Sequence, residues 1–131
     1  MSKSYPEITR EVSGLLSQLR RDTPEPLRGF SALAGAAMQP GALDAKTKEL
    51  IAMALSVAAR CDPCLGFHAQ ALVRLGCTQA ELEEMLAVCV YMGGGPSLMY
   101  AAHALQAWQQ FDAAAGAAAA LSPSAAVPAQ A

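Results

Sequence analysis

The sequence has few aromatic residues, and most of its apolar content is alanine and aliphatic side chains. Hydrophobic residues make up 53% of the 131-residue chain, but aromatic residues make up only 5%. A β-sandwich draws on aromatic and β-branched side chains, whereas alanine and straight aliphatic side chains favour closely packed helices. The composition therefore predicts an all-α fold. The length fits one domain that buries its own core without metal ions or disulfides as staples.

The chain also lacks the features of several other protein classes. Its charges nearly balance, with 9 Lys and Arg against 11 Asp and Glu, and it has no basic run. We therefore expect neither nucleic acid nor an anionic membrane surface as a partner. No apolar run approaches the roughly 20 residues that span a bilayer. The N-terminus has no apolar stretch typical of a secretory signal, so we interpret the 4 cysteines as thiols in a reducing cytoplasm.

Helical spacing of apolar residues predicts one domain of about six helices. The expected helices cover residues 5–21, 27–38, 44–60, 61–75, 78–92 and 97–111. The third is apolar on most faces towards its end, so we expect it at the centre of the domain. The glycines and proline at 93–96 lack the ending of a phosphate-binding loop and indicate a turn between helices.

Several helix ends carry recognisable signals. Asp44 is a plausible N-cap for the third helix, and Gly76 is a plausible stop for the fourth. Thr78 and Glu81 form a capping-box pattern that opens the fifth helix. The chain divides into an N-terminal helix at 1–22, a helical domain at 23–111 and an Ala/Pro/Ser-rich tail at 112–131. We expect that tail to be disordered because it has few large apolar groups to bury.

The segment CDPCLGFH, residues 61–68, places two cysteines and a histidine on one helical face. At 100° per residue, Cys61, Cys64 and His68 fall within an arc of about 60°. His68 lies one turn beyond Cys64, within reach of a hydrogen bond made directly or through water. A helix N-terminus favours thiolate, and a CxxC pair can close into a disulfide. The segment thus predicts a redox site with an activated sulfur, a resolving sulfur and a base.

Glu49 is the candidate for orienting this base. It lies in an otherwise apolar stretch, where a carboxylate is costly unless it has a partner. If the third and fourth helices pack antiparallel, Glu49 and His68 reach a similar depth. The alternative is a solvated charge in the first turns of the helix, beside Lys46 and Lys48. The residues alone leave both interpretations open.

Glu49, eleven intervening residues and then Cys61-x-x-Cys64-x-x-x-His68 form a specific pattern. Over residues 25–111 the chain resembles the AhpD-like proteins of the carboxymuconolactone decarboxylase superfamily. That resemblance implies a helical thiol peroxidase and disulfide reductase that assembles as a trimer or hexamer. Its substrate would be a hydroperoxide and its reductant an external dithiol of lipoyl or thioredoxin type, with no cofactor and no resident metal.

The resemblance also implies roles for single residues. Cys64 would be the peroxidatic thiol, Cys61 its disulfide partner, and His68 with Glu49 the proton relay. Helix-terminus electrostatics alone favours Cys61 as the thiol with the lower pKa. The family's assignment of Cys64 and the electrostatic preference for Cys61 are compatible if Cys64 attacks the peroxide and Cys61 reacts with the reductant. The chain departs from alkylhydroperoxide reductase D at Pro63, where that protein carries a histidine between its cysteines.

Two alternatives to an oxidoreductase come from other classes. The first is a zinc site with Cys61, Cys64 and His68 as three ligands, completed by one of three further residues: Cys77, Cys89 or His103. The second is a non-enzymatic helical binding module with incidental cysteines. Exposed apolar residues would favour oligomerisation under any of these hypotheses, and the candidates are Met92, Leu98 and Met99. Otherwise Cys77 and Cys89 are expected to be packed thiols, and His103 a packed histidine.

Overall fold

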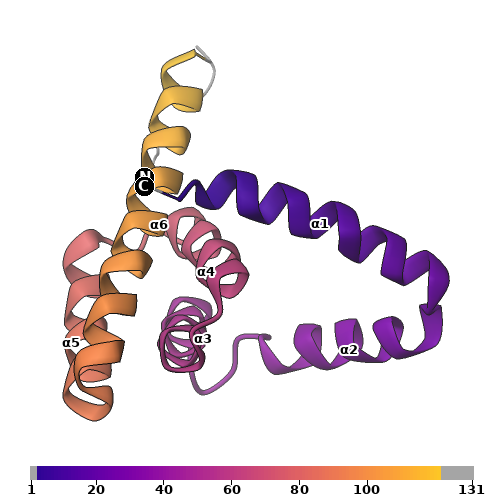
Figure 1. The fold of residues 1–131 in the computed structure, drawn as a ribbon, viewed down its shortest axis with the longest axis horizontal. Helices are drawn as coiled ribbons and strands as arrows, with labels where there is room; N and C mark the ends of the chain where they lie inside the picture. Colours follow the sequence, from indigo (N-terminus) through magenta and orange to yellow (C-terminus); the bar gives the residue numbers. More distant parts are fainter. Residues whose placement is uncertain (1–2, 122–131) are drawn as a thin grey trace.

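The computed structural model describes residues 3–121, which fold almost entirely into six α-helices (Figure 1). These are α1 (Tyr5–Asp22), α2 (Pro24–Ala37), α3 (Ala45–Ala59), α4 (Asp62–Arg74), α5 (Gln79–Gly93) and α6 (Gly95–Leu121). Within this described part of the chain there is no strand. The all-α prediction is confirmed. None of the described helices is both long and apolar enough to cross a lipid bilayer.

The predicted capping signals set the ends of three helices. The Asp44 carboxylate accepts a hydrogen bond from the backbone N–H of Thr47 at 2.7 Å and begins α3. Thr78 and Glu81 make both hydrogen bonds of the capping box at the start of α5. Gly76 follows α4 with a φ of 75°, the left-handed conformation that glycine adopts at low cost. These local predictions are confirmed.

Two helices extend beyond their predicted bounds. α2 begins at Pro24, three residues before the predicted start at Leu27. α6 begins at Gly95 and continues to Leu121, although the sequence predicts a disordered tail from residue 112. That prediction is wrong for residues 112–121, of which seven are alanine, the strongest helix former. The rest of the predicted tail, residues 122–131, lies outside the described residues.

α4 is the central element of the core. It packs against α1, α3 and α6, and Leu65, Ala69 and Leu72 on it are fully buried. α4 approaches α1 so closely at Gly66 that an added Cβ would lie 2.6 Å from the methyl carbon of Thr9. The close packing of α1 on α4 therefore favours glycine at position 66. This contact holds α1 against the helix that begins at the CxxC pair.

The prediction that α3 lies at the centre of the domain is correct for only one of its faces. Met53 and Val57 are fully buried, but Ile51 and Leu55 are 45% and 64% exposed. In a single chain, α3 therefore covers the core with one side and presents an apolar side outwards. The sequence predicted burial because the helix is apolar nearly all round.

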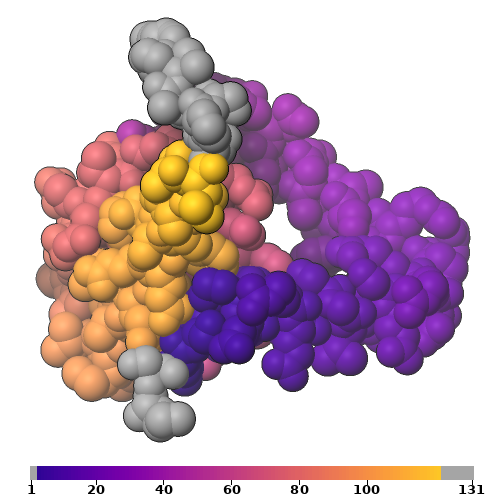
Figure 2. All heavy atoms as spheres, turned by 90° about the horizontal axis from the view of Figure 1, so that it is seen from above, coloured from indigo at the N-terminus to yellow at the C-terminus, as the bar shows by residue number. Residues whose placement is uncertain are grey.

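α1 and α2 form an arm that projects from the body of the molecule (Figure 1). α2 packs against α1 and no other helix of the described chain, and none of its residues is buried. Figure 2 shows an opening between the outer part of this arm and the body. Four large apolar side chains of the arm are exposed: Leu15, Leu19, Phe30 and Leu33. The boundary expected between residues 22 and 23 stays a prediction.

Candidate functional site

The two cysteines of CDPC lie at the N-terminus of α4. Cys61 is the N-cap residue, and its Sγ accepts a hydrogen bond from the backbone N–H of Cys64 at 3.3 Å. A disulfide joins Cys61 and Cys64, whose Cα atoms are 5.2 Å apart. Arg60 ends α3 in the left-handed conformation, with φ 57° and ψ 45°, so that the chain turns directly into α4. Both sulfur-bearing residues are partly exposed, which leaves them accessible to a reactant.

Glu49 and His68 meet where α3 and α4 pack together. Nδ1 of His68 and Oε1 of Glu49 are 2.7 Å apart, and the two side chains are 31% and 16% exposed. The neighbouring lysines bind elsewhere: Lys46 pairs with Glu81, and Lys48 donates to backbone carbonyls. Glu49 is therefore not a solvated surface charge. An ionised carboxylate can only accept hydrogen bonds, so Nδ1 donates and, in the neutral ring, Nε2 keeps its lone pair.

One cleft brings the cysteines and the histidine together. Cys61, Cys64 and His68 line a cleft of about 330 Å³, and its other lining residues come from α3: Ala52, Leu55, Ser56 and Ala59. No direct hydrogen bond joins the His68 ring to either sulfur in the described structure. Of the four residues predicted from the motif, Cys61, Cys64 and His68 line one mainly apolar cleft, and Glu49 holds the His68 ring by a hydrogen bond.

Sequence reasoning missed one charged pair beside the cysteines. The Nζ atom of Lys3 lies 2.5 Å from Oδ2 of Asp62, the residue that directly follows Cys61. Burial opposes ionisation of Asp62, but the hydrogen bond from Lys3 and further favourable interactions with Tyr100 and the Lys3 charge outweigh it, so the pKa of the Asp62 carboxyl lies below its usual value. The pair joins residues 59 positions apart. Only the acidic residue inside the CxxC motif hinted at it.

The ligand set of the alternative zinc site does not assemble. Residues 3–121 contain no group of three or more His, Cys, Asp or Glu side chains placed to hold a metal ion. Cys77 is buried in the core, and burial raises the pKa of its thiol and of the Cys89 thiol. His103 packs edge-on against the ring of Tyr100, with the ring centroids 5.1 Å apart.

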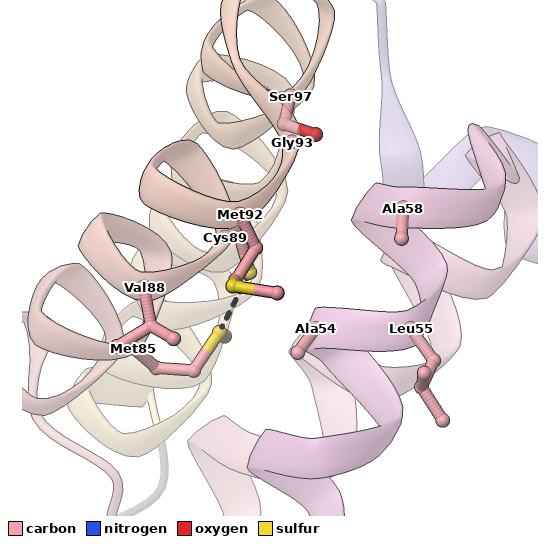
Figure 3. Close-up of a pocket in the computed structure, with 9 residues that line it drawn as sticks. All are labelled: Ala54, Leu55, Ala58, Met85, Val88, Cys89, Met92, Gly93 and Ser97. Atoms are coloured by element: carbon pink, nitrogen blue, oxygen red, sulfur yellow. Dashed lines mark hydrogen bonds between the residues drawn. The ribbon is translucent and has the colours of Figure 1, made fainter.

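A second, apolar cleft lies between α3 and α5 and is separate from the disulfide (Figure 3). Its volume is about 260 Å³, and its lining includes Ala54 and Leu55 of α3 and Met85, Val88 and Met92 of α5. The thiol of Cys89 in this cleft lies 3.5 Å from the sulfur of Met85. Leu55 lines both this cleft and the cleft of the disulfide, so the two clefts adjoin at this side chain.

Comparison with known proteins identifies relatives along most of the chain. The sequence profile described as the carboxymuconolactone decarboxylase family matches residues 24–107. One similar structure is the crystal structure of an apo carboxymuconolactone decarboxylase family protein from Legionella pneumophila. Its sequence is 55% identical to this chain, and the two structures match with a TM-score of 0.83. The match covers 85% of this chain and 99% of that one.

Two further relatives are more distant. A Thermotoga maritima protein of the same family, linked as a possibility to an antioxidative response, is 28% identical with a TM-score of 0.74. That match covers 92% of this chain and 99% of the relative. An uncharacterized protein of Cupriavidus necator is 43% identical over 99 residues, which are 76% of this chain and 84% of that protein.

Proposed function

The chain belongs to the carboxymuconolactone decarboxylase family, and we propose that it is a thiol-dependent hydroperoxidase and disulfide oxidoreductase. The observation that carries the proposal is the cleft lined by Cys61, Cys64 and His68, together with the hydrogen bond by which Glu49 holds the His68 ring. The disulfide supplies a two-electron couple, and the imidazole supplies a base beside it. Antioxidant defence is the role that such chemistry would serve.

In the oxidative half-reaction, Cys64 and Cys61 act in turn. His68 takes the Cys64 proton at Nε2, and the thiolate attacks one peroxide oxygen. The O–O bond breaks, the leaving alkoxide takes the proton back from His68, and Cys64 becomes a sulfenic acid. Glu49 holds the Nδ1–H and stabilises the charged ring. The Cys61 sulfur then attacks the Cys64 sulfur, forming the disulfide and releasing water.

In the reductive half-reaction, an external dithiol of lipoyl or thioredoxin type restores both thiols. One thiolate of the reductant attacks a sulfur of the disulfide and forms a mixed disulfide. Its second thiol closes the reductant into its own disulfide and leaves Cys61 and Cys64 reduced. Attack on Cys61 expels Cys64 first, as the thiolate on the side of His68, and Cys61 leaves when the second thiol of the reductant resolves the mixed disulfide. The helix N–H that the Cys61 sulfur accepts stabilises the thiolate that leaves in this second step.

The test is a coupled assay of hydroperoxide consumption with dihydrolipoamide or reduced thioredoxin. We expect turnover by the wild-type protein, none by Cys64→Ser, and a single oxidation event by Cys61→Ser. Cys89→Ala, which changes a thiol outside the redox cleft, is the matched control and is expected to turn over normally. Full turnover by Cys64→Ser under a saturating dithiol would end the assignment of Cys64.

We also propose that the protein is a homotrimer or homohexamer. The exposed apolar side chains of the arm and of the α3–α5 cleft form apolar surfaces that a second copy of the chain would cover. Met92 lines that cleft and is 76% exposed, so a charge at this position tests whether the cleft is a subunit interface. Met92→Glu should reduce the mass measured by sedimentation velocity. Leu121→Glu, which alters an 85% exposed leucine at the end of α6, should not. A monomeric wild-type protein would reject the proposal.

A further inference from the structure

The side chain of Gln110 holds the N-terminal segment against α6. Its Oε1 accepts a hydrogen bond from the backbone N–H of Tyr5, and its Nε2 donates to the carbonyl of Lys3, both at 2.7 Å. Tyr5 is fully buried, which anchors the segment beside the core. The two hydrogen bonds and the burial of Tyr5 fix the backbone of residues 3–5 and direct the Lys3 side chain to the start of α4.

Lys3 meets Asp62 at the point where α4 begins. One carboxylate oxygen, Oδ2, binds the ammonium group, and the other, Oδ1, is buried without a protein hydrogen-bond partner among the described residues. Tyr5 on one side and Tyr100 and His103 of α6 on the other are near enough to interact electrostatically with this carboxylate. Lys3 is therefore the cation that pairs with a partly buried negative charge directly after Cys61, the two side chains being 40% and 27% exposed.

We propose that Lys3 and Asp62 form a positioning pair that sets the thiol–disulfide balance of Cys61 and Cys64. The inference rests on the proposed function only in treating these cysteines as the working redox couple. Neither Lys3 nor Asp62 lines the cleft of the disulfide, so the pair acts through charge and through the placement of the helix start.

The physical reason is that reduction creates negative charge at this helix start. A dithiol transfers two electrons and two protons to the disulfide, is itself oxidised to a disulfide, and leaves two thiols that ionise to thiolates. An unneutralised carboxylate within one turn disfavours a thiolate, whereas the paired carboxylate does so much less. Lys3 therefore favours the ionised, reduced form, and loss of Lys3 favours the disulfide.

The experiment measures thiol ionisation and reduction potential without any peroxide. Reduced protein is alkylated with iodoacetamide across a pH series, with Cys61 and Cys64 resolved by peptide mass spectrometry. The redox balance is then titrated in dithiothreitol buffers. Asp62→Asn should lower the pKa of the more acidic thiol by about half to one unit, and Lys3→Met should raise it by a similar amount. The potential should become more oxidising in the first variant and more reducing in the second.

Two comparisons separate charge from loss of structure. Lys3→Met should have a smaller effect on the thiol pKa in an Asp62→Asn background, because without the carboxylate the ammonium group is no longer held beside the start of α4. Gln110→Ala, which releases the segment, should shift the thiol in the direction of Lys3→Met. Lys46→Met removes another lysine–carboxylate pair, near the far end of α3 and about 20 Å along that helix, and should leave the thiols unchanged.

Shifts of the same sign in Asp62→Asn and Lys3→Met, or no shift in either, would overturn the proposal. If the wild-type protein consumes no peroxide but the two variants shift the thiol pKa in opposite directions, the positioning pair is supported and the peroxidase assignment is rejected. A protein that consumes peroxide and shows no shifts rejects the pair alone.

Discussion

Glu49→Gln tests whether the carboxylate activates His68 or merely fills space. The amide has nearly the same size, and its oxygen can still accept the Nδ1–H of His68, so the ring keeps its orientation and tautomer. What disappears is the negative charge 2.7 Å from the ring nitrogen. The imidazolium that forms when His68 accepts the Cys64 proton then loses its counter-charge.

The size of the effect follows from the burial of the pair. A hydrogen bond to a charged partner contributes about 1.5–3 kcal/mol, which corresponds to about 10- to 160-fold in rate. Water screens part of this interaction, because the His68 side chain is 31% exposed and that of Glu49 16%. We therefore expect the lower part of that range, about 10- to 30-fold, for Glu49→Gln.

The assay is a single turnover of the reduced protein with an organic hydroperoxide, quenched on the millisecond scale and followed by counting of remaining thiols. Glu84→Gln, on the exposed surface of α5, is the matched control for loss of one carboxylate. His68→Asn should lose at least as much rate, and adding Glu49→Gln to it should cost little more, because the two residues act as a unit. A Glu49→Gln rate within twofold of wild type would refute the reasoning.

Three further predictions concern stability. Gly66→Ala should lower the free energy of unfolding in urea by about 1–3 kcal/mol, since its Cβ would lie 2.6 Å from the Thr9 methyl. Gly14→Ala, which has open space around the new Cβ, should not lower the free energy of unfolding. Equal losses of stability in the two variants would contradict the close packing at Gly66. Leu72→Ala, at a fully buried position, should lower it by about 2–5 kcal/mol; a loss below 1 kcal/mol would show a looser core. Because the pKa of Asp62 is lowered from its ordinary 3.8, its stabilising contribution is complete above that value and is lost as pH falls through the lower folded-state pKa. Acid unfolding followed by circular dichroism should therefore be less steep for Asp62→Asn below about pH 4, and an identical curve would argue against the ion pair.

The local signals in the sequence predicted local structure well. Asp44 and the Thr78–Glu81 box act within one helical turn, so their partners can be found by counting residues. The Glu49–His68 contact could be predicted from the sequence for a related reason. Only a short connection separates α3 from α4, and an antiparallel return brings side chains at comparable distances from the turn within reach of each other.

Two of the failures have a different cause, because they depend on contacts between distant parts of the chain or on surfaces that one chain leaves open. The Lys3–Asp62 pair joins residues 59 positions apart, and no periodic pattern carries that information. The exposure of Leu55 was missed because an apolar side chain looks the same in sequence whether it packs in a core or faces another surface. The continuation of α6 to Leu121 reflects alanine propensity outweighing the lack of a buried face.

The central claim is that Cys64 reacts with peroxide and Cys61 resolves the product. The most direct measurement is dimedone trapping of sulfenic acid in reduced Cys61→Ser, with the modified residue located by peptide mass spectrometry after one equivalent of hydroperoxide. The account predicts stoichiometric label on Cys64, little on Cys77 or Cys89, and none in the wild-type protein, where the disulfide forms instead. A label confined to Cys77 or Cys89, or an unmodified Cys64 after the peroxide is consumed, would contradict it.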